Sequence, residues 1–173
     1  QNISLLTEVY LQGGLNFLST SACYDCRHTF RSISPSLKWF KECWKIISTN
    51  ELEVFNPEVE DIRRERYRQY YQTLSKYVRE GTLLDVGASY GTGAKVFQEN
   101  GFRVEAVEPE DDRVKYLENF FNIPVRASSI EELALHSGNY DLVIFAHCLE
   151  HLDDPALVAS QMKNLLNDST GIL

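Results

Sequence analysis

The second half of the chain alternates short apolar runs with segments of helical periodicity. Each run has the length of one buried strand, and a helical segment separates it from the next run. Strands that alternate with helices require right-handed crossovers, which give a parallel sheet covered on both faces. We therefore predict a doubly wound α/β fold with strands at Leu83–Val86, Val104–Val107, Val125–Ala127 and Leu142–Ala146. Gly171–Leu173 resembles the start of a fifth strand, so the fold is expected to be truncated there.

Helix-terminal signals place the intervening helices. Gly101 is expected to close a helix over Thr92–Asn100, and the segment from Ser129 to Glu132 is a capping box that opens a short helix. Pro155 is expected to begin a further helix. The inward face of that helix is predicted to comprise Val158, Met162, Leu165 and Leu166.

A longer helix is predicted before the first of these strands. Asn56 has the residue type of an N-cap, Pro57 suits the first turn, and Gly81 is expected to end the helix. Apolar positions at helical spacing predict its buried face, namely Val59, Ile62, Tyr70, Leu74 and Tyr77. The intervening charged residues are interpreted as a solvated face, namely Arg63, Arg64, Glu65, Arg66 and Arg68.

Residues 1–55 are expected to form a small N-terminal region, helical in part, and residues 56–173 the main domain. Ser36–Ile47 has its apolar residues on one helical face and follows a loop or small hairpin around Cys23 and Cys26. This Cys-x-x-Cys pair supplies only half of the ligands that structural zinc normally takes. We therefore expect no bound metal.

The balance of charge narrows the class of partner. Lys and Arg number 17 against 25 Asp and Glu, which gives a formal net charge of -8, and the basic residues form no long block. Such a chain is unsuited to tight binding of nucleic-acid phosphates, so a small-molecule substrate is expected. No apolar run approaches the roughly 20 residues of a membrane span, and residues 1–12 lack the pattern of a secretory signal. We expect a cytoplasmic protein.

A loop of small residues joins the first predicted strand to the next helix. It contains Gly87 and Gly91, and such a loop lets the backbone approach a ligand closely at the carboxyl edge of the sheet. Glu108 ends the following strand, where a carboxylate can bind both hydroxyls of a ribose, and this suits NAD and S-adenosylmethionine equally. Asp85 favours S-adenosylmethionine, because a carboxylate repels a pyrophosphate and attracts a cationic amino group.

Four segments, taken together in order and spacing, resemble the motifs of class I S-adenosylmethionine-dependent methyltransferases of the small-molecule type. They are Leu83–Gly91, Val107–Pro109, Tyr140–Val143 and Leu149–Pro155. The resemblance implies a Rossmann-like fold, S-adenosylmethionine as cofactor, and an acceptor such as a sugar, a lipid-linked intermediate or a natural-product intermediate. It implies cofactor contacts from Asp85, Gly87, Ala88, Ser89, Gly91, Glu108, Pro109, Ser129, Ile130 and Ala146. Ser89 departs from the family, which commonly has a second glycine there, and the cysteine pair resembles half of a zinc ribbon that precedes some methyltransferase domains.

Polar residues after the fourth strand are the candidates for contact with the acceptor and for catalysis, namely His147, Glu150 and His151. A methyltransferase holds its nucleophile in line with the methyl group and often removes a proton from it, which is the task of a general base. The alternative is that these residues only organise the turn. Two other functions stay open, an NAD-dependent oxidoreductase and a non-catalytic nucleoside-binding module that docks a partner protein. An unfinished sheet edge also favours a homodimer.

Overall fold

The computed structural model describes residues 3–11, 14–31, 56–133, 139–148, 151–152, 154–167 and 171–172. The chain divides into two compact units, Gln1–Val54 and Phe55–Leu173, and each is described by itself. The helix expected over Ser36–Ile47 lies outside the described residues.

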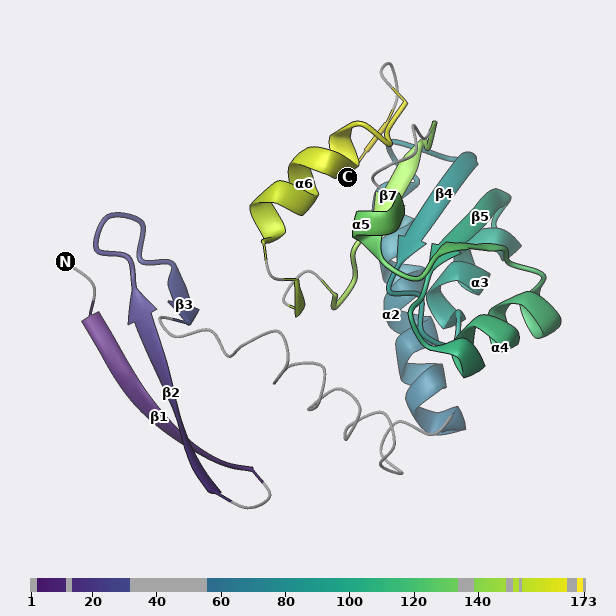
Figure 1. Cartoon of the computed structure of the whole chain (residues 1–173). Helices are drawn as coiled ribbons and strands as arrows, with labels where there is room; N and C mark the ends of the chain where they lie inside the picture. The colour runs from purple at the N-terminus through teal and green to yellow at the C-terminus, as the bar shows by residue number, and fades with distance from the viewer. Residues whose placement is uncertain are drawn as a thin grey trace. The chain divides into compact units, whose positions relative to one another are not determined.

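The first unit contains an antiparallel sheet with the strand order β1–β2–β3 (Figure 1). β1 (Ile3–Leu11) pairs with β2 (Gly14–Ala22) along its whole length, and this hairpin was not predicted. β3 (Thr29–Arg31) pairs with the end of β2, so Cys23 and Cys26 lie in a hairpin turn, as the sequence predicts. Both cysteines are free thiols, and the described part of the chain holds no group of three or more potential metal ligands.

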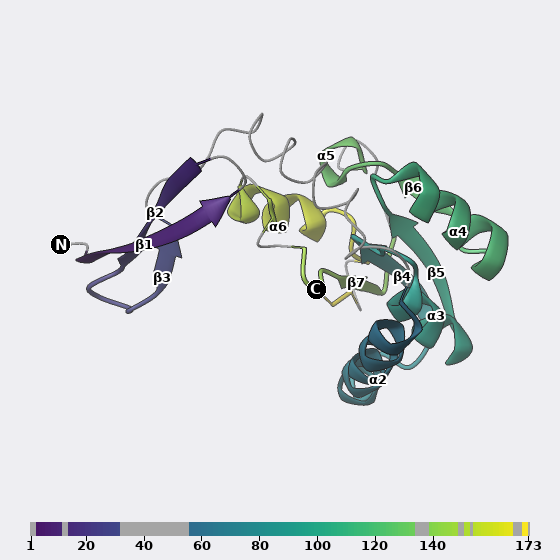
Figure 2. The ribbon, with the colours of Figure 1, turned by 90° about the horizontal axis from the view of Figure 1, so that it is seen from below.

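The second unit is built on a parallel sheet ordered β6–β5–β4–β7 (Figures 1 and 2). Its strands are β4 (Gly81–Val86), β5 (Phe102–Val107), β6 (Val125–Ala127) and β7 (Leu142–Ile144). The chain moves outward from β4 through β5 to β6 and then returns to the other side of β4, so the strand order reverses at β4. Ligands of open α/β sheets bind at the carboxyl ends of strands at such a reversal. Ile172 forms a parallel bridge with Leu142, where the fifth strand was expected to begin.

Helices cover both faces of this sheet (Figure 2). On one face, α2 (Pro57–Leu74), α3 (Thr92–Glu99) and α4 (Asp111–Phe121) pack with the core cluster that includes Leu83. On the other face, α5 (Ile130–Leu133) and α6 (Pro155–Lys163) pack with the cluster that includes Leu84. Successive residues of β4 therefore enter different cores, as expected for a strand that is buried on both faces. The predicted doubly wound α/β fold is confirmed.

The predicted helix starts are confirmed by their capping bonds. Asn56 Oδ1 accepts a hydrogen bond from the Glu58 N–H at 3.0 Å, and Ser129 Oγ accepts one from the Glu132 N–H at 3.2 Å. The Asp154 carboxylate caps α6 by accepting from the Leu157 N–H at 2.9 Å. Val158 and Met162 are buried on the inward face of α6 as predicted, but the helix ends at Lys163, so the buried Leu165 and the partly buried Leu166 follow it. Local sequence signals therefore fix these helix starts correctly.

Two predictions about α2 are wrong. The helix ends at Leu74, and Gly81 instead begins β4, where a Cβ would lie 2.3 Å from Asp141 Oδ2. Tyr70 and Leu74 do pack against the core, whereas three residues of the predicted buried face are exposed, namely Val59, Ile62 and Tyr77. The first turns face inward through Glu60, which is 8% exposed and accepts a hydrogen bond from the hydroxyl of Thr92.

Candidate functional site

The backbone of the loop between β4 and α3 has left-handed conformations and passes very close to the side chain of a neighbouring segment. Gly87 and Gly91 both have a φ of 77°, in the left-handed region that favours glycine. A Cβ on Gly87 would lie 2.9 Å from the Cβ of Cys148, so packing as well as conformation requires glycine there. Ser89 also has a left-handed φ of 53°. The loop leads directly into the N-terminus of α3, where unpaired N–H groups give a positive partial charge.

Glu108, which follows β5, is hydrogen-bonded to this loop. Its Oε2 accepts a hydrogen bond from the Ser89 N–H at 2.7 Å, and its Oε1 accepts one from the Glu110 N–H at 3.1 Å. Arg113 Nη1 lies 3.8 Å from Oε1. The residue is 2% exposed, and burial raises the pKa of Glu108 while the two amides oppose that rise. The carboxylate keeps unused lone pairs, so it can still accept hydrogen bonds from ligand hydroxyls.

Asp85 is the penultimate residue of β4 and is 1% exposed. Within the described part of the chain, neither of its carboxylate oxygens has a hydrogen-bond partner. Burial, followed by the charge of Glu108, raises the pKa of Asp85 to about 7, and the nearby backbone N–H of Ala94 partly offsets this. A buried carboxylate without a partner is costly, because burial removes its hydration without replacing it. The site is therefore suited to a ligand that brings a positive charge.

Helix α2 packs directly on the glycine loop and the start of α3. A Cβ on Gly93 would lie 2.2 Å from Cε1 of Tyr67, so the tyrosine ring rests on the glycine backbone. Burial, followed by the charge of Asp85, raises the pKa of Tyr67. The buried carboxylate and a tyrosine of α2 therefore border the same part of the loop.

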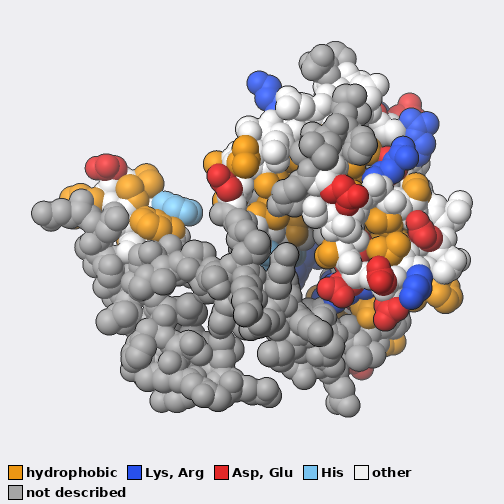
Figure 3. Space-filling model, in the orientation of Figure 1, with side chains coloured by type: hydrophobic (Ala, Val, Ile, Leu, Met, Phe, Trp, Pro, Cys, Tyr) orange, Lys and Arg blue, Asp and Glu red, His pale blue; other side chains and the backbone are white. Residues whose placement is uncertain are grey.

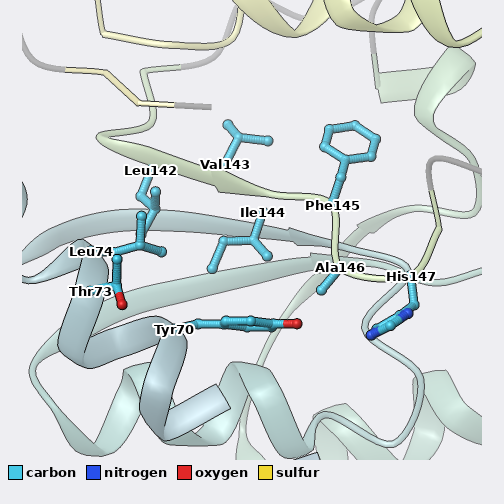
Figure 4. Close-up of a pocket in the computed structure, with 9 residues that line it drawn as sticks. All are labelled: Tyr70, Thr73, Leu74, Leu142, Val143, Ile144, Phe145, Ala146 and His147. Carbon is cyan, nitrogen blue, oxygen red and sulfur yellow. The ribbon is translucent and has the colours of Figure 1, made fainter. Parts of the chain in front are cut away.

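A pocket of about 410 Å³ lies between α2 and β7 (Figure 4). Its lining comprises Tyr70, Thr73 and Leu74 from α2 and the continuous segment from Leu142 to His147. None of these described lining residues is acidic, and most are apolar. The volume falls within the range of about 300–1,000 Å³ that is typical of small-molecule sites.

The end of this pocket at the carboxyl edge of β7 is polar. His147 has a left-handed φ of 59°, and its Nε2 lies 2.8 Å from Nη1 of Arg66. A guanidinium can only donate, so Nε2 is the acceptor and the imidazole carries its proton on Nδ1. Figure 4 shows the hydroxyl of Tyr70 directed toward His147. Arg66 and Tyr70 lie one turn apart on the same face of α2.

The structure brings most of the predicted cofactor residues to one edge of the sheet. Asp85, Ser89 and Glu108 interact through the contacts above, and the exposed Pro109 follows Glu108. Ser129 and Ile130 come directly after β6, which neighbours β5. Ile130 is 3% exposed and packs in the core beneath α5 and α6, so its side chain serves the core.

The candidate catalytic residues do not share one site. Ala146 and His147 line the pocket, whereas His151 is not among its lining residues and donates its backbone N–H to the Cys148 carbonyl at 3.0 Å. Glu150 lies outside the described residues. Of the two candidate catalytic histidines, His147 is therefore the one that lines the pocket.

Three residues of α2 at the site were missed by sequence reasoning. Arg66 was assigned to the solvated face, Glu60 was interpreted only as an acidic residue near the positive end of the helix dipole, and Tyr67 was not singled out. Glu60 and Tyr67 lie two turns apart on one helical face, which Leu74 continues. An acidic residue on an otherwise apolar face was the signal that could have identified this surface.

A parallel sheet with a glycine loop after β4 and a carboxylate after β5 defines the class of Rossmann-like nucleoside-binding proteins. The sequence identifies one family within that class. Residues 59–173 match the methyltransferase-domain family, so the chain belongs to that family.

Several solved structures share the fold of this chain. A SAM-dependent methyltransferase from Archaeoglobus fulgidus is 25% identical with a TM-score of 0.53, covering 62% of this chain and 48% of that chain. The YcgJ protein from Bacillus subtilis is 17% identical with a TM-score of 0.53, covering 61% and 47%. PH0226 from Pyrococcus horikoshii is 19% identical with a TM-score of 0.53, covering 73% and 61%.

The chain spans about half the length of the first two of these solved structures. No curated protein matches its sequence. None of the helices in the described part of the chain combines the length and apolar character needed to cross a bilayer.

Proposed function

We propose that residues 56–173 bind S-adenosylmethionine and catalyse transfer of its methyl group to a small-molecule acceptor in the cytoplasm. The observation that carries the proposal is the buried Asp85 carboxylate, which has no hydrogen-bond partner among the described residues and lies at the carboxyl edge of the sheet. Only a cation or a strong donor compensates such a group. The ammonium group of S-adenosylmethionine has that chemistry, so the residues fit the cofactor.

The remaining proposed contacts are those that the family resemblance implies. The glycine loop holds the methionine part through Asp85, Gly87, Ala88, Ser89 and Gly91. Glu108 accepts the ribose hydroxyls with lone pairs that the Ser89 and Glu110 amides leave unused. The adenine lies beside Pro109, Ser129 and the backbone of Ile130, and Ala146 closes the site next to the pocket.

When bound, the cofactor supplies an electrophilic methyl group. The protein orients the acceptor nucleophile in the pocket between α2 and β7 and excludes water with its apolar lining. His147 Nε2 is the atom best placed to take a proton from the nucleophile, since it lies at the end of the pocket. The pocket volume suits an acceptor of the size of a sugar, or the head of a lipid-linked or natural-product intermediate.

The charge of the site argues against NAD. A pyrophosphate over the glycine loop would approach both Asp85 and Glu108, and the charge of Glu108 already disfavours the ionisation of Asp85. Membership of the methyltransferase-domain family argues in the same direction.

Calorimetric titration with S-adenosylhomocysteine tests the proposal. The wild-type chain is expected to bind saturably, Asp85→Ala and Glu108→Ala are expected to lose binding, and Asp112→Ala, whose side chain is 95% exposed on α4, is the charge-matched control. Competition by NADH in place of S-adenosylhomocysteine would support the oxidoreductase alternative. A folded wild-type chain that binds neither compound would refute cofactor binding by this chain.

A further inference from the structure

We propose that Arg66, Tyr70 and His147 form an anion-binding subsite at the end of the pocket, and that the methyl acceptor carries a carboxylate or phosphate group. The inference rests on the proposed function in one respect, which is that the pocket between α2 and β7 receives the acceptor. It adds the chemical class of that acceptor and a role for Arg66.

Arg66 differs from the other arginines of α2. Those arginines each form an ion pair, Arg63 with Glu60 at 2.7 Å, Arg64 with Glu99 at 2.5 Å and Arg68 with Glu65 at 3.4 Å. Arg66 forms no ion pair with any acidic residue that the structure describes, and its hydrogen-bond partner is the imidazole of His147. A guanidinium has five N–H donors in a planar fork that matches a carboxylate or phosphate. The contact with His147 uses one of them.

The surroundings favour an anion at this point. The formal net charge is -8, and Figure 3 shows acidic and basic side chains intermingled on one face of the second unit. The described lining of the pocket, in contrast, has no carboxylate. Arg66 contacts His147 at the end of the pocket, and Figure 4 shows the Tyr70 hydroxyl directed toward the same imidazole. An anionic group entering the pocket would therefore meet donors and no opposing charge from its lining.

The contact between Arg66 and His147 also links anion binding to the state of the imidazole. The Arg66 N–H occupies the Nε2 lone pair of His147 at 2.8 Å. An anion is a stronger acceptor for that N–H than a neutral imidazole nitrogen, so its binding would draw the guanidinium away. The acceptor's own anionic group would thus anchor it and expose the proton-accepting atom beside it.

The test is nitrogen NMR of the His147 ring in the full chain, with the signal assigned by its loss in His147→Gln. Inorganic phosphate and acetate are titrated separately, with sodium chloride at equal ionic strength as reference, in the presence and absence of S-adenosylhomocysteine. Arg66→Gln is compared with Arg68→Gln, which removes the same charge from the same helix at a residue that contacts Glu65 and not His147. S-adenosylhomocysteine binding is measured on every sample.

We expect a saturable change of the His147 ring signals with at least one anion, weakened about tenfold or more in Arg66→Gln and unchanged in Arg68→Gln. The anion that binds more tightly distinguishes a phosphate from a carboxylate acceptor. Unchanged ring signals in the wild type, or equal titrations in both arginine variants, would overturn the inference even if S-adenosylhomocysteine binds. Anion binding through Arg66 without S-adenosylhomocysteine binding would support the subsite and count against the methyltransferase proposal.

Discussion

The charge of Asp85 is expected to destabilise the ligand-free protein above neutral pH. Its side chain is 1% exposed, and its pKa rises from 3.8 to about 7 because burial and the neighbouring Glu108 disfavour ionisation. Asp85→Asn keeps the shape of the side chain and removes the ionisable group. We therefore expect this variant to be more stable than the wild type at high pH and unable to bind the cofactor.

The sign and size of the effect follow from proton linkage. Between pH 4 and 7 the folded state keeps a proton on Asp85 that the unfolded state releases, so stability falls as pH rises through this window and then levels off. The interval is about 3 pH units, and at about 1.4 kcal/mol per unit the upper limit of the loss is about 4 kcal/mol. An asparagine amide also needs partners, but that cost is the same at every pH.

Urea denaturation at pH 5 and pH 8, followed by helical circular dichroism, measures this difference, because all the described helices belong to the second unit. About 2 pH units of the titration window lie between pH 5 and pH 7, so the wild type is expected to lose stability between the two pH values, and Asp85→Asn to lose up to about 3 kcal/mol less. The exposed Asp112→Asn is the control and should follow the wild type. Parallel pH profiles for Asp85→Asn and the wild type would refute the reasoning.

Three further predictions concern other parts of the second unit. Glu108→Gln keeps the shape but removes the charge that Ser89 and Glu110 amides surround, and calorimetry should show about tenfold weaker binding of S-adenosylhomocysteine or more. Gly93→Ala places a Cβ 2.2 Å from the Tyr67 ring, and urea denaturation should show a loss of about 1–3 kcal/mol, while an unchanged midpoint would contradict this packing. Asp154→Ala removes the cap of α6 and should cost about 1 kcal/mol, with S-adenosylhomocysteine affinity unchanged.

The sheet and the glycine loop could be predicted from the sequence because their signals are local. Four apolar runs of strand length specify β4 to β7, and a left-handed turn between strand and helix selects glycine at Gly87 and Gly91. The motif that ends β5 likewise places Glu108 without tertiary information. These are positions at which burial or backbone conformation restricts the residue type.

The contribution of α2 could not be predicted in the same way, since it depends on what the helix packs against. Glu60 of α2 is buried where Thr92 of α3 donates a hydrogen bond to it, and Arg66 contacts His147, which follows β7 and lines the pocket. Neither pairing is local in sequence. The β1–β2 hairpin was overlooked for a different reason, because Leu5 and Leu6 interrupt the alternation that marks a half-buried strand.

The two hydrogen bonds that Glu108 accepts from backbone amides affect how quickly a nucleoside can bind at the site. Ser89 and Glu110 hold the carboxylate from two separate loops, so its rotamer is already selected before any nucleoside arrives. A ligand then loses little affinity to ordering this side chain, and its association does not have to wait for a rearrangement there. The same hydrogen bonds connect the two loops. Glu108 therefore stabilises the ligand-free protein in addition to recognising the nucleoside.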